Sequence, residues 1–292
     1  MDERDWLSGR FQQHRSHLRA VAYRMLGSVS EADDALQEAW LRVRDQEPGS
    51  IENMQAWLTT VVGRVCLNML RSRRSRPDDV SVHVPDPVVS LDEDLDPEHE
   101  ALLAESVGLA MLVVLDALTP AERLAFVLHD VFGVPFADIA RALDRSEAAA
   151  QQLASRARRR VQGCPEPDAD LARQREVVDA FFAASRVGDF DALVALLDPD
   201  VELRIDGGVL RAEASLMLHG GEAVAGHTAT YATLHPFVLP ALVNGAAGAV
   251  VAPRGQVFSV MAFVVTNRKI TQIDALVDPE RLAQLKVSIP PQ

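Results

Sequence analysis

Several features that secreted, membrane-bound or metal-binding proteins need are scarce in this sequence. The 292 residues include only two cysteines, Cys66 and Cys164, too few for a disulfide framework or a cysteine-based metal cluster. The longest apolar run near the C-terminus covers residues 260–265, far short of the ~20 residues of a membrane-spanning helix. The N-terminus is acidic and lacks the basic start and apolar core of a secretory signal. These absences predict a cytoplasmic protein without a metal or another cofactor.

Lysine is also rare, with 2 lysines against 27 arginines, and the net charge is −13. A negative balance argues against nucleic-acid binding when it is taken over the whole chain. The charges are unevenly spread, however: residues 1–76 carry a net +2, 77–105 a net −10, 106–163 a net +1 and 164–292 a net −6. Two nearly neutral, arginine-bearing segments are therefore separated by an acidic segment and followed by an acidic domain.

The length suggests two or three domains, and 48% hydrophobic residues provide enough apolar material for their cores. Residues 77–105 contain Pro77, Pro85, Pro87 and Pro97 and have no lysine or arginine. Proline disrupts helices, and a run of like charges repels itself. This segment is therefore predicted to be an extended acidic linker.

The first segment is predicted to be helical from residue 8 to 76, because its apolar residues recur at helical spacing. Ser30 is expected to be the N-cap of a helix over 31–44, with Asp33 at the capping-box position. A second long helix ends in the basic run 71–76. That run indicates contact with nucleic acid or, equally, a solvated helix end of the kind that the helix dipole favours in any protein.

The third segment predicts three helices, over about 120–131, 136–143 and 146–161, with Thr119 and Ser146 as N-caps. The last two helices and the tight turn between them have the pattern of a helix-turn-helix. The alternative is an ordinary helical hairpin with a solvated polar face.

The last of these helices is predicted to turn Ala149, Leu153 and Ala157 toward the core, since they are four residues apart. Its outward residues are then Glu147, Ala148, Gln151, Gln152, Ser155, Arg156 and Arg159. Amide groups can hydrogen-bond to base edges, and guanidinium groups can hold phosphates. This face suits the major groove of DNA.

Residues 164–292 change in character. Two helical patterns, around 177–182 and 193–197, lead into a strand at 201–206 in which apolar and polar residues alternate. Residues 257–266 and 270–277 read as two strands of a hairpin. Helices followed by strands predict an α+β domain.

Three blocks of the sequence, in one order, resemble the extracytoplasmic-function sigma factors of the sigma-70 family. The blocks are AYRMLGS with EADDALQEAWLRV, MQAWLTTVVGRVCLNMLRSRRSR, and LTPAERLAFVLHDVFGVPFADIARALDRSEAAAQQLASRARRRV. They cover about residues 11–163. The resemblance implies two all-α sigma domains: region 2 over 1–76, and region 4, with the helix-turn-helix, over 106–163.

The resemblance also implies the partners, which are core RNA polymerase, through its clamp coiled coil and flap, and promoter DNA. The residues implied to bind the clamp are Asp33, Asp34, Gln37 and Glu38. Those implied to meet the −10 element are Arg64, Asn68, Arg71, Arg73 and Arg74, together with the loop 47–54. Those implied to meet the −35 element are Arg145, Ser146, Gln151, Gln152, Ser155, Arg156 and Arg159.

Residues 164–292 are similar to the cone-shaped α+β SnoaL-like domain that is fused to one subgroup of these sigma factors. Three motifs of that subgroup are partly present: DGGG as 206–209 with one glycine missing, NPDKL as 278–282, and the linker motif WLPEP reduced to 82–87. In the family these segments dock the C-terminal domain near the linker. The implied regulatory contact is formed by Pro85, Pro87, Asp206, Gly207, Gly208, Asp278 and Pro279.

Other functions stay open beside a sigma factor regulated in cis. SnoaL-like folds also include enzymes, and the candidate acid–base residues are Asp206, His219, His227, His235 and Asp274. An aspartate on a strand beside a histidine could remove a proton next to a carbonyl if both line one cavity. The domain could instead sense a small molecule in its pocket, or the chain could be a repressor that needs no polymerase. Because a fold alone does not confer chemistry, we expect no enzyme activity.

Overall fold

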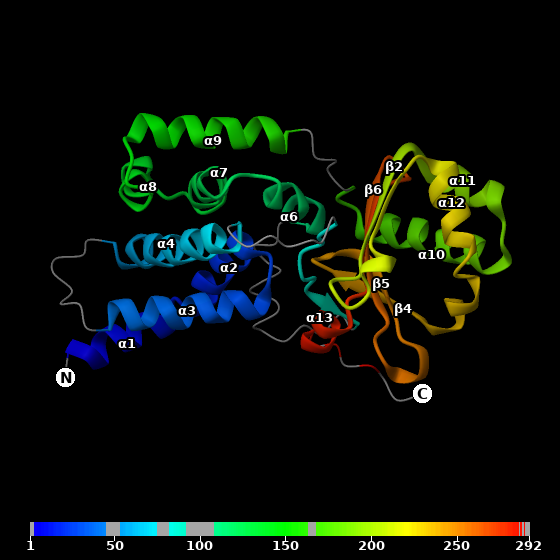
Figure 1. Cartoon of the computed structure of the whole chain (residues 1–292), viewed down its shortest axis with the longest axis horizontal. Coiled ribbons are helices and arrows are strands. Elements are labelled where there is room, and N and C mark those ends of the chain that lie inside the picture. The colour runs from blue at the N-terminus through cyan, green and yellow to red at the C-terminus, as the bar shows by residue number, and fades with distance from the viewer. Residues whose placement is uncertain are drawn as a thin grey trace. The chain divides into compact units, whose positions relative to one another are not determined.

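The computed structural model describes residues 3–44, 53–74, 82–91, 108–162 and 168–285, together with 287 and 289. They belong to two compact units, and Figure 1 colours the chain by residue number from blue at the N-terminus to red at the C-terminus. The first unit holds the described residues up to 74 and those from 114 to 162, and the second holds 82–91, 108–113 and the residues from 168 onward. No helix in these parts is long and apolar enough to cross a membrane.

The first segment consists of the helices α1 (Glu3–Gln13), α2 (Arg15–Leu26), α3 (Val29–Val43) and α4 (Met54–Arg74), which confirms the helical prediction. Its core is formed by side chains that are at most 1% exposed, among them Leu18, Val21, Met25, Leu36, Leu58, Val62 and Val65. These residues recur at helical spacing, so each helix turns one apolar stripe inward.

The start of α3 differs from the prediction. The N-cap is Ser28, whose Oγ accepts a hydrogen bond from the backbone N–H of Glu31 at 3.4 Å, and Ser30 lies inside the helix. Both serines precede acidic residues, but Asp33 is turned toward Arg19, whose guanidinium binds its carboxylate through two hydrogen bonds. Ser30 therefore lacks the partner that a capping box requires.

The third segment contains α6 (Leu109–Asp116), α7 (Pro120–Phe126), a π-helical turn η1 (Val127–Val131), α8 (Phe136–Leu143) and α9 (Glu147–Val161). Thr119 and Ser146 are the N-caps of α7 and α9, as predicted. The inward face of α9 is rotated slightly from the predicted one, because Ala150, Leu153, Ala154 and Ala157 are buried and Ala149 is only half-buried.

The helices of the first and third segments share one core, although the sequence separates them by a linker. Helix α4 packs against α7 and α8, and a Cβ on Gly63 would lie 3.0 Å from side-chain atoms of Leu124 and Leu128. Arg123 is 2% exposed, and its guanidinium donates to the carbonyl of Arg24 at 3.2 Å and to Asp116 at 2.7 Å. A buried arginine with these partners is a specific contact between the two segments.

The second unit is built on a seven-stranded sheet in the order β1-β4-β5-β6-β7-β2-β3. The strands are β1 (Val89–Ser90), β2 (Leu197–Asp206), β3 (Leu216–His219), β4 (Val238–Val243), β5 (Ala246–Val251), β6 (Ser259–Thr266) and β7 (Lys269–Leu276). Strands β2 and β7 are parallel, and the other neighbouring pairs are antiparallel.

Helices α10 (Leu171–Val187), α11 (Phe190–Leu196) and α12 (Gly221–Ala229) lie together on one side of this sheet (Figure 1). Three short 3-10 turns, η2 (Ala212–Ala214), η3 (Ala232–Phe237) and η4 (Pro253–Gly255), and the helix α13 (Pro279–Gln284) complete the unit. Its core joins Phe181 of α10 to Leu203, Phe263 and Ile273 on the strands. The expected α+β architecture is confirmed.

The hairpin of β6 and β7 was predicted, and its turn residues Asn267 and Arg268 both have positive φ, as a two-residue hairpin turn requires. Strands β4 and β5 were not predicted. Every residue of β5 after the first is buried, so it lacks the alternation that reveals a half-buried strand.

Candidate linker-docking site and nucleic-acid-binding faces

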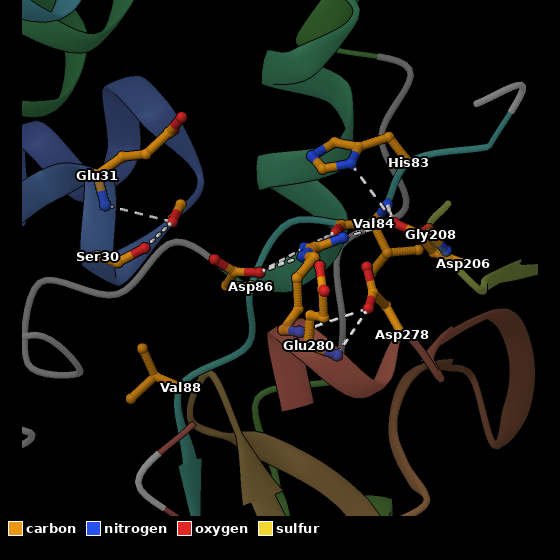
Figure 2. Close-up of polar contacts among 12 residues, drawn as sticks. Ser30, Glu31, His83, Val84, Asp86, Val88, Asp206, Gly208, Asp278 and Glu280 are labelled. Atoms are coloured by element: carbon orange, nitrogen blue, oxygen red, sulfur yellow. Dashed lines mark hydrogen bonds and ion pairs between the residues drawn. The ribbon is translucent and has the colours of Figure 1, made fainter. Parts of the chain in front are cut away.

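The acidic linker is bound along its described part by the C-terminal domain, within one compact unit (Figure 2). Residues 82–88 form no helix, and residues 89 and 90 form β1. Val82, Val84, Val88 and Val89 are each at most 7% exposed. Burial of a valine side chain contributes roughly 1.5–3 kcal/mol, so these four side chains supply much of the binding.

The backbone of the linker is held at two places. At the first, the N–H of Val84 donates to a carboxylate oxygen of Asp206 at 2.9 Å, and its carbonyl accepts from the guanidinium of Arg281. At the second, Val88 and Asn244 exchange two hydrogen bonds, at 3.0 and 2.8 Å. Strand β1 then pairs with the edge strand β4, with Val89 opposite residue 243. The linker thus adds a strand to the sheet.

Arg281 binds two buried carboxylates that are 120 residues apart in sequence. Its guanidinium contacts Asp206 at 2.7 Å and Asp86 at 2.6 Å. Asp86 is 7% exposed and Asp206 is 1% exposed, so each would be strongly destabilising without a cation. Asp278 is the N-cap of α13, because its carboxylate accepts a hydrogen bond from the N–H of Glu280 at 2.9 Å (Figure 2). This cap fixes the start of the helix that carries Arg281.

Two glycines let these segments approach closely. A Cβ on Gly207 would lie 2.0 Å from the carbonyl oxygen of Arg211, and a Cβ on Gly208 would lie 1.9 Å from a carboxylate oxygen of Asp278. Gly208 also has a φ of +62°, and its N–H donates to Asp206 at 2.9 Å. The partial glycine motif is therefore sterically required at this site.

Asp206 is ionised here despite its burial. Burial alone would raise its pKa, but hydrogen bonds from His83, Val84 and Gly208 and the charge of Arg281 lower the pKa to about 2. The imidazole Nδ1 of His83 lies 3.4 Å from the carboxylate. The ionised carboxylate therefore contributes its full share to the stability of the folded protein at any pH well above 4.

The structure brings the predicted regulatory residues together. Pro85 and Pro87 are buried in the docked linker, and Asp206 binds the linker directly. Gly207 and Gly208 follow Asp206, Gly208 packs against Asp278, and Asp278 and Pro279 begin α13, which carries Arg281. The sequence reasoning missed Arg281, Asp86 and Asn244. Arg281 occupies the basic position of the NPDKL-like motif, and Asp86 is the acidic residue of the linker motif 82–87. The opposite charges of these two residues, in two motifs implied to dock together, were the signal that could have predicted their ion pair.

The face predicted to bind the clamp lies on α3. Asp34, Gln37 and Glu38 are exposed, and Glu38 forms an ion pair with Arg42 one turn away. Asp33 is held by Arg19 and serves the packing of α2 on α3.

The face predicted to meet the −10 element lies on α4, where Arg64, Asn68 and Arg71 are exposed and follow one another at helical spacing. Arg73 instead forms an ion pair with Glu31. The side chain of Arg74 and residues 47–52 of the predicted loop lie outside the described residues.

The face predicted to meet the −35 element lies on α9 and the turn before it. The exposed residues of this face are Arg145, Gln151, Gln152, Ser155, Arg156 and Arg159. Ser146 is exposed but its hydroxyl accepts from the N–H of Ala149, and Arg156 lies 3.7 Å from the buried Glu122. The amides and arginines thus share one solvent-facing surface, as a groove-binding helix requires.

The acid–base candidates do not form one site. His227 and His235 line a cavity of about 310 Å³ beneath α10, whereas Asp206, Asp274 and His219 lie outside it. Burial raises the pKa of Asp274 to about 6, although Arg204 and Gln272 oppose the shift. The strand aspartate and the histidine that proton abstraction would need are therefore not brought together.

The architecture defines a multidomain protein with a helix-turn-helix and a linker captured by an α+β domain. Residues 10–76 match the family model for sigma-70 region 2, and residues 109–161 match that for sigma-70 region 4. The chain is 44% identical over 218 residues to the ECF RNA polymerase sigma factor SigJ of Mycobacterium tuberculosis, covering 73% of this chain and 69% of that protein.

The probable ECF RNA polymerase sigma factor SigI of the same organism is 33% identical over 301 residues and is matched over 99% of both chains. The crystal structure of M. tuberculosis SigJ superposes with a TM-score of 0.76 and 34% identity, covering 96% of this chain and 100% of that one. The chain belongs to the extracytoplasmic-function sigma factors. Members of this class bind core RNA polymerase and direct transcription initiation at particular promoters.

We predict that Arg281→Met and Asn244→Gly release the linker at its two anchoring points. The first change removes the cation between Asp86 and Asp206, and the second removes the acceptor of the Val88 N–H while keeping a residue suited to the positive φ at 244. Amide hydrogen exchange should accelerate by roughly a hundredfold at Val84 in the first variant.

In Asn244→Gly the amide of Val88 should exchange faster, with a smaller effect at Val84. Arg268→Met is the control, because Arg268 is exposed and lies in the hairpin turn away from the linker. Unchanged exchange at both amides would contradict the docking geometry.

The depressed pKa of Asp206 predicts a specific acid sensitivity. A carboxylate whose pKa is lowered on folding stabilises the fold fully above about pH 4, and this contribution is lost as the pH falls toward 2. Between pH 5 and pH 3 the wild-type protein should lose about 1 kcal/mol of unfolding free energy from this group. Urea unfolding at both pH values measures it, and Asp206→Asn should show a correspondingly smaller loss. Identical losses would show that folding does not lower the pKa of Asp206.

Proposed function

We propose that this sigma factor is regulated in cis by its C-terminal domain, which captures the linker between regions 2 and 4 and thereby limits promoter-directed transcription. The observation that carries the proposal is the burial of residues 82 and 84–89 of the linker against that domain, with Asp86 and Asp206 sharing Arg281. A linker that is buried and hydrogen-bonded on its own protein is unavailable to polymerase.

The charge of the linker supports a competition of this kind. Residues 77–105 carry ten acidic side chains and no lysine or arginine, so the linker suits a positively charged channel that also receives nucleic acid. Docking withdraws Asp86 and its neighbours from such a channel. Transcription then depends on the balance between two binding sites for one segment.

The three exposed faces are proposed to have the roles that the family resemblance implies. Asp33, Asp34, Gln37 and Glu38 on α3 bind the polymerase clamp, with the partly exposed Asp33 held in place by Arg19. Arg64, Asn68 and Arg71 on α4 meet the −10 strand. The residues proposed to meet the −35 duplex are Arg145, Gln151, Gln152, Ser155, Arg156 and Arg159.

Two changes of charge test the polymerase-binding face against the repressor alternative. Asp34→Lys combined with Glu38→Lys should abolish association with core polymerase, since two exposed acids on α3 become bases. Binding is measured with purified core enzyme at low salt. Asp191→Lys with Glu222→Lys, two exposed acids of the C-terminal domain, is the matched control and should bind normally. Equal binding by both double variants would reject the proposed face.

The regulatory proposal predicts that release of the linker raises promoter output. Arg281→Met should increase transcription by purified core enzyme several-fold, because a docked state that is destabilised by a few kcal/mol becomes poorly populated. Arg268→Met should behave as wild type. Polymerase association and the circular dichroism of each variant are measured in parallel. Output that is unchanged or lower in a folded Arg281→Met protein would contradict regulation by linker capture.

A further inference from the structure

A row of exposed side chains on α9 ends at an arginine that the sequence reasoning did not include. Gln152, Arg156 and Arg160 are four residues apart and all exposed, so they follow one another along one face of the helix. The neighbouring row, which is also exposed, consists of Gln151, Ser155 and Arg159. Arg160 therefore extends the groove-binding face by one turn beyond Arg156.

Both arginines of the first row contact one buried carboxylate. Nη1 of Arg160 donates to Oε2 of Glu122 at 3.1 Å, and Nε of Arg156 lies 3.7 Å from Oε1. The side chain of Glu122 is 6% exposed, whereas those of Arg156 and Arg160 are 53% and 54% exposed. A carboxylate inside the protein thus holds two guanidinium groups at its surface.

The position of Glu122 is fixed by the start of α7. Its Oε2 accepts hydrogen bonds from the N–H of Thr119 at 3.1 Å and from the hydroxyl of Thr119 at 2.7 Å, and the two residues form a complete capping box. Burial alone would raise the pKa of Glu122, but the hydrogen bonds from Thr119 and the charges of Arg160 and Arg156 lower the pKa. The carboxylate is therefore ionised at neutral pH.

A second ion pair on the same helix has a different balance of charge. Nε of Arg158 lies 2.5 Å from a carboxylate oxygen of Asp130, so one arginine faces one acid and the charges cancel. At Glu122 two positive charges meet one negative charge, and a net +1 remains beside the exposed glutamines. A guanidinium has five N–H donors, and Arg160 gives one of them to Glu122. The remaining donors suit an anion outside the protein.

We propose that Arg156 and Arg160 together hold one backbone phosphate of a DNA duplex, and that Glu122 positions both side chains for this contact. Guanidinium groups match the geometry of phosphate oxygens, and a side chain that is already held loses less conformational freedom on binding. Arg160 lies about two turns after Gln152, so the phosphate is held at one end of the row and the amide meets the bases at the other. This inference rests on the proposed −35-binding role of α9 and adds Arg160 and Glu122 to it.

A phosphate contact is independent of base sequence and appears in the salt dependence of binding. The test uses the full-length protein and a fluorescent mixed-sequence DNA duplex, titrated over a range of salt concentrations. Arg160→Met should weaken binding and reduce the slope of log affinity against log salt concentration by about 1. Arg158→Met is the matched control, because Arg158 lies on the same helix but is paired with Asp130, and its slope should equal that of the wild type.

The phosphate contact would be refuted if the wild-type protein did not bind the duplex at low salt, or if Arg160→Met and Arg158→Met had equal slopes. Absence of promoter-directed transcription with core polymerase would instead reject the −35 role and leave a measured phosphate contact standing. The two proposals therefore fail separately.

The positioning role of Glu122 is tested by combining variants. Glu122→Gln keeps an oxygen that can accept from Thr119 and removes the charge that holds the arginines. It should weaken duplex binding several-fold in the otherwise wild-type protein and have no effect in a protein that already carries Arg156→Met and Arg160→Met. Glu122→Asp, which keeps the charge on a shorter side chain, gives a second reading of the same cycle should Glu122→Gln fail to fold.

The other outcomes of this cycle contradict the positioning role. Equal weakening in both backgrounds would mean that Glu122 acts only through the fold of α7. Tighter or unchanged binding in the otherwise wild-type protein would mean that its charge only opposes the phosphate. Circular dichroism of each variant shows that the compared proteins are folded.

Discussion

One guanidinium shared by two buried carboxylates determines where the linker of this protein lies. Asp86 belongs to the linker and Asp206 to a strand end of the C-terminal domain, and Arg281 contacts both. The apolar contacts of the linker valines add binding energy but little specificity. Because a buried carboxylate without a cation is strongly destabilising, the ion pairs select this one register of the linker on the domain.

The surrounding residues serve that interaction. Gly207 and Gly208 allow the strand end to approach α13, and Asp278 caps α13 so that Arg281 points toward the linker. Asn244 fixes the second anchoring point and lies in the turn between β4 and β5. The C-terminal domain therefore contains a built receptor for a segment of its own chain, and the cavity beneath α10 shares backbone hydrogen bonds with that receptor through Val277.

Much of the local structure was predictable, because it depends on neighbours in sequence. Thr119 and Ser146 were recognised as N-caps, and the apolar residues of the helix-turn-helix recur at the spacing of an inward helix face. The hairpin around Asn267 was recognised from two strand patterns with a turn between them. The misplaced cap of α3 shows the limit of this reasoning. Ser28 and Ser30 look alike locally, and the contact of Asp33 with Arg19 on another helix distinguishes them.

The docking site could be predicted only in part, because it depends on contacts across more than 100 residues. The family resemblance pointed to the linker prolines, the glycine turn and the 278–282 motif. It did not reveal that Asp86 pairs with Arg281 or that Val89 extends the sheet beside β4. Likewise, the histidines at 227 and 235 were named as acid–base candidates, but nothing in their spacing showed that they line a cavity without a carboxylate.

The central claim is that the linker leaves the C-terminal domain when the sigma factor works with polymerase. Amide hydrogen exchange of the wild-type protein, free and bound to core polymerase on a promoter, measures this directly. The account predicts that the amides of Val84 and Val88 exchange slowly in the free protein, because they donate to Asp206 and Asn244. In the complex these two hydrogen bonds are lost, so the exchange rates of both amides change. Identical protection of both amides in a complex that initiates transcription would contradict it.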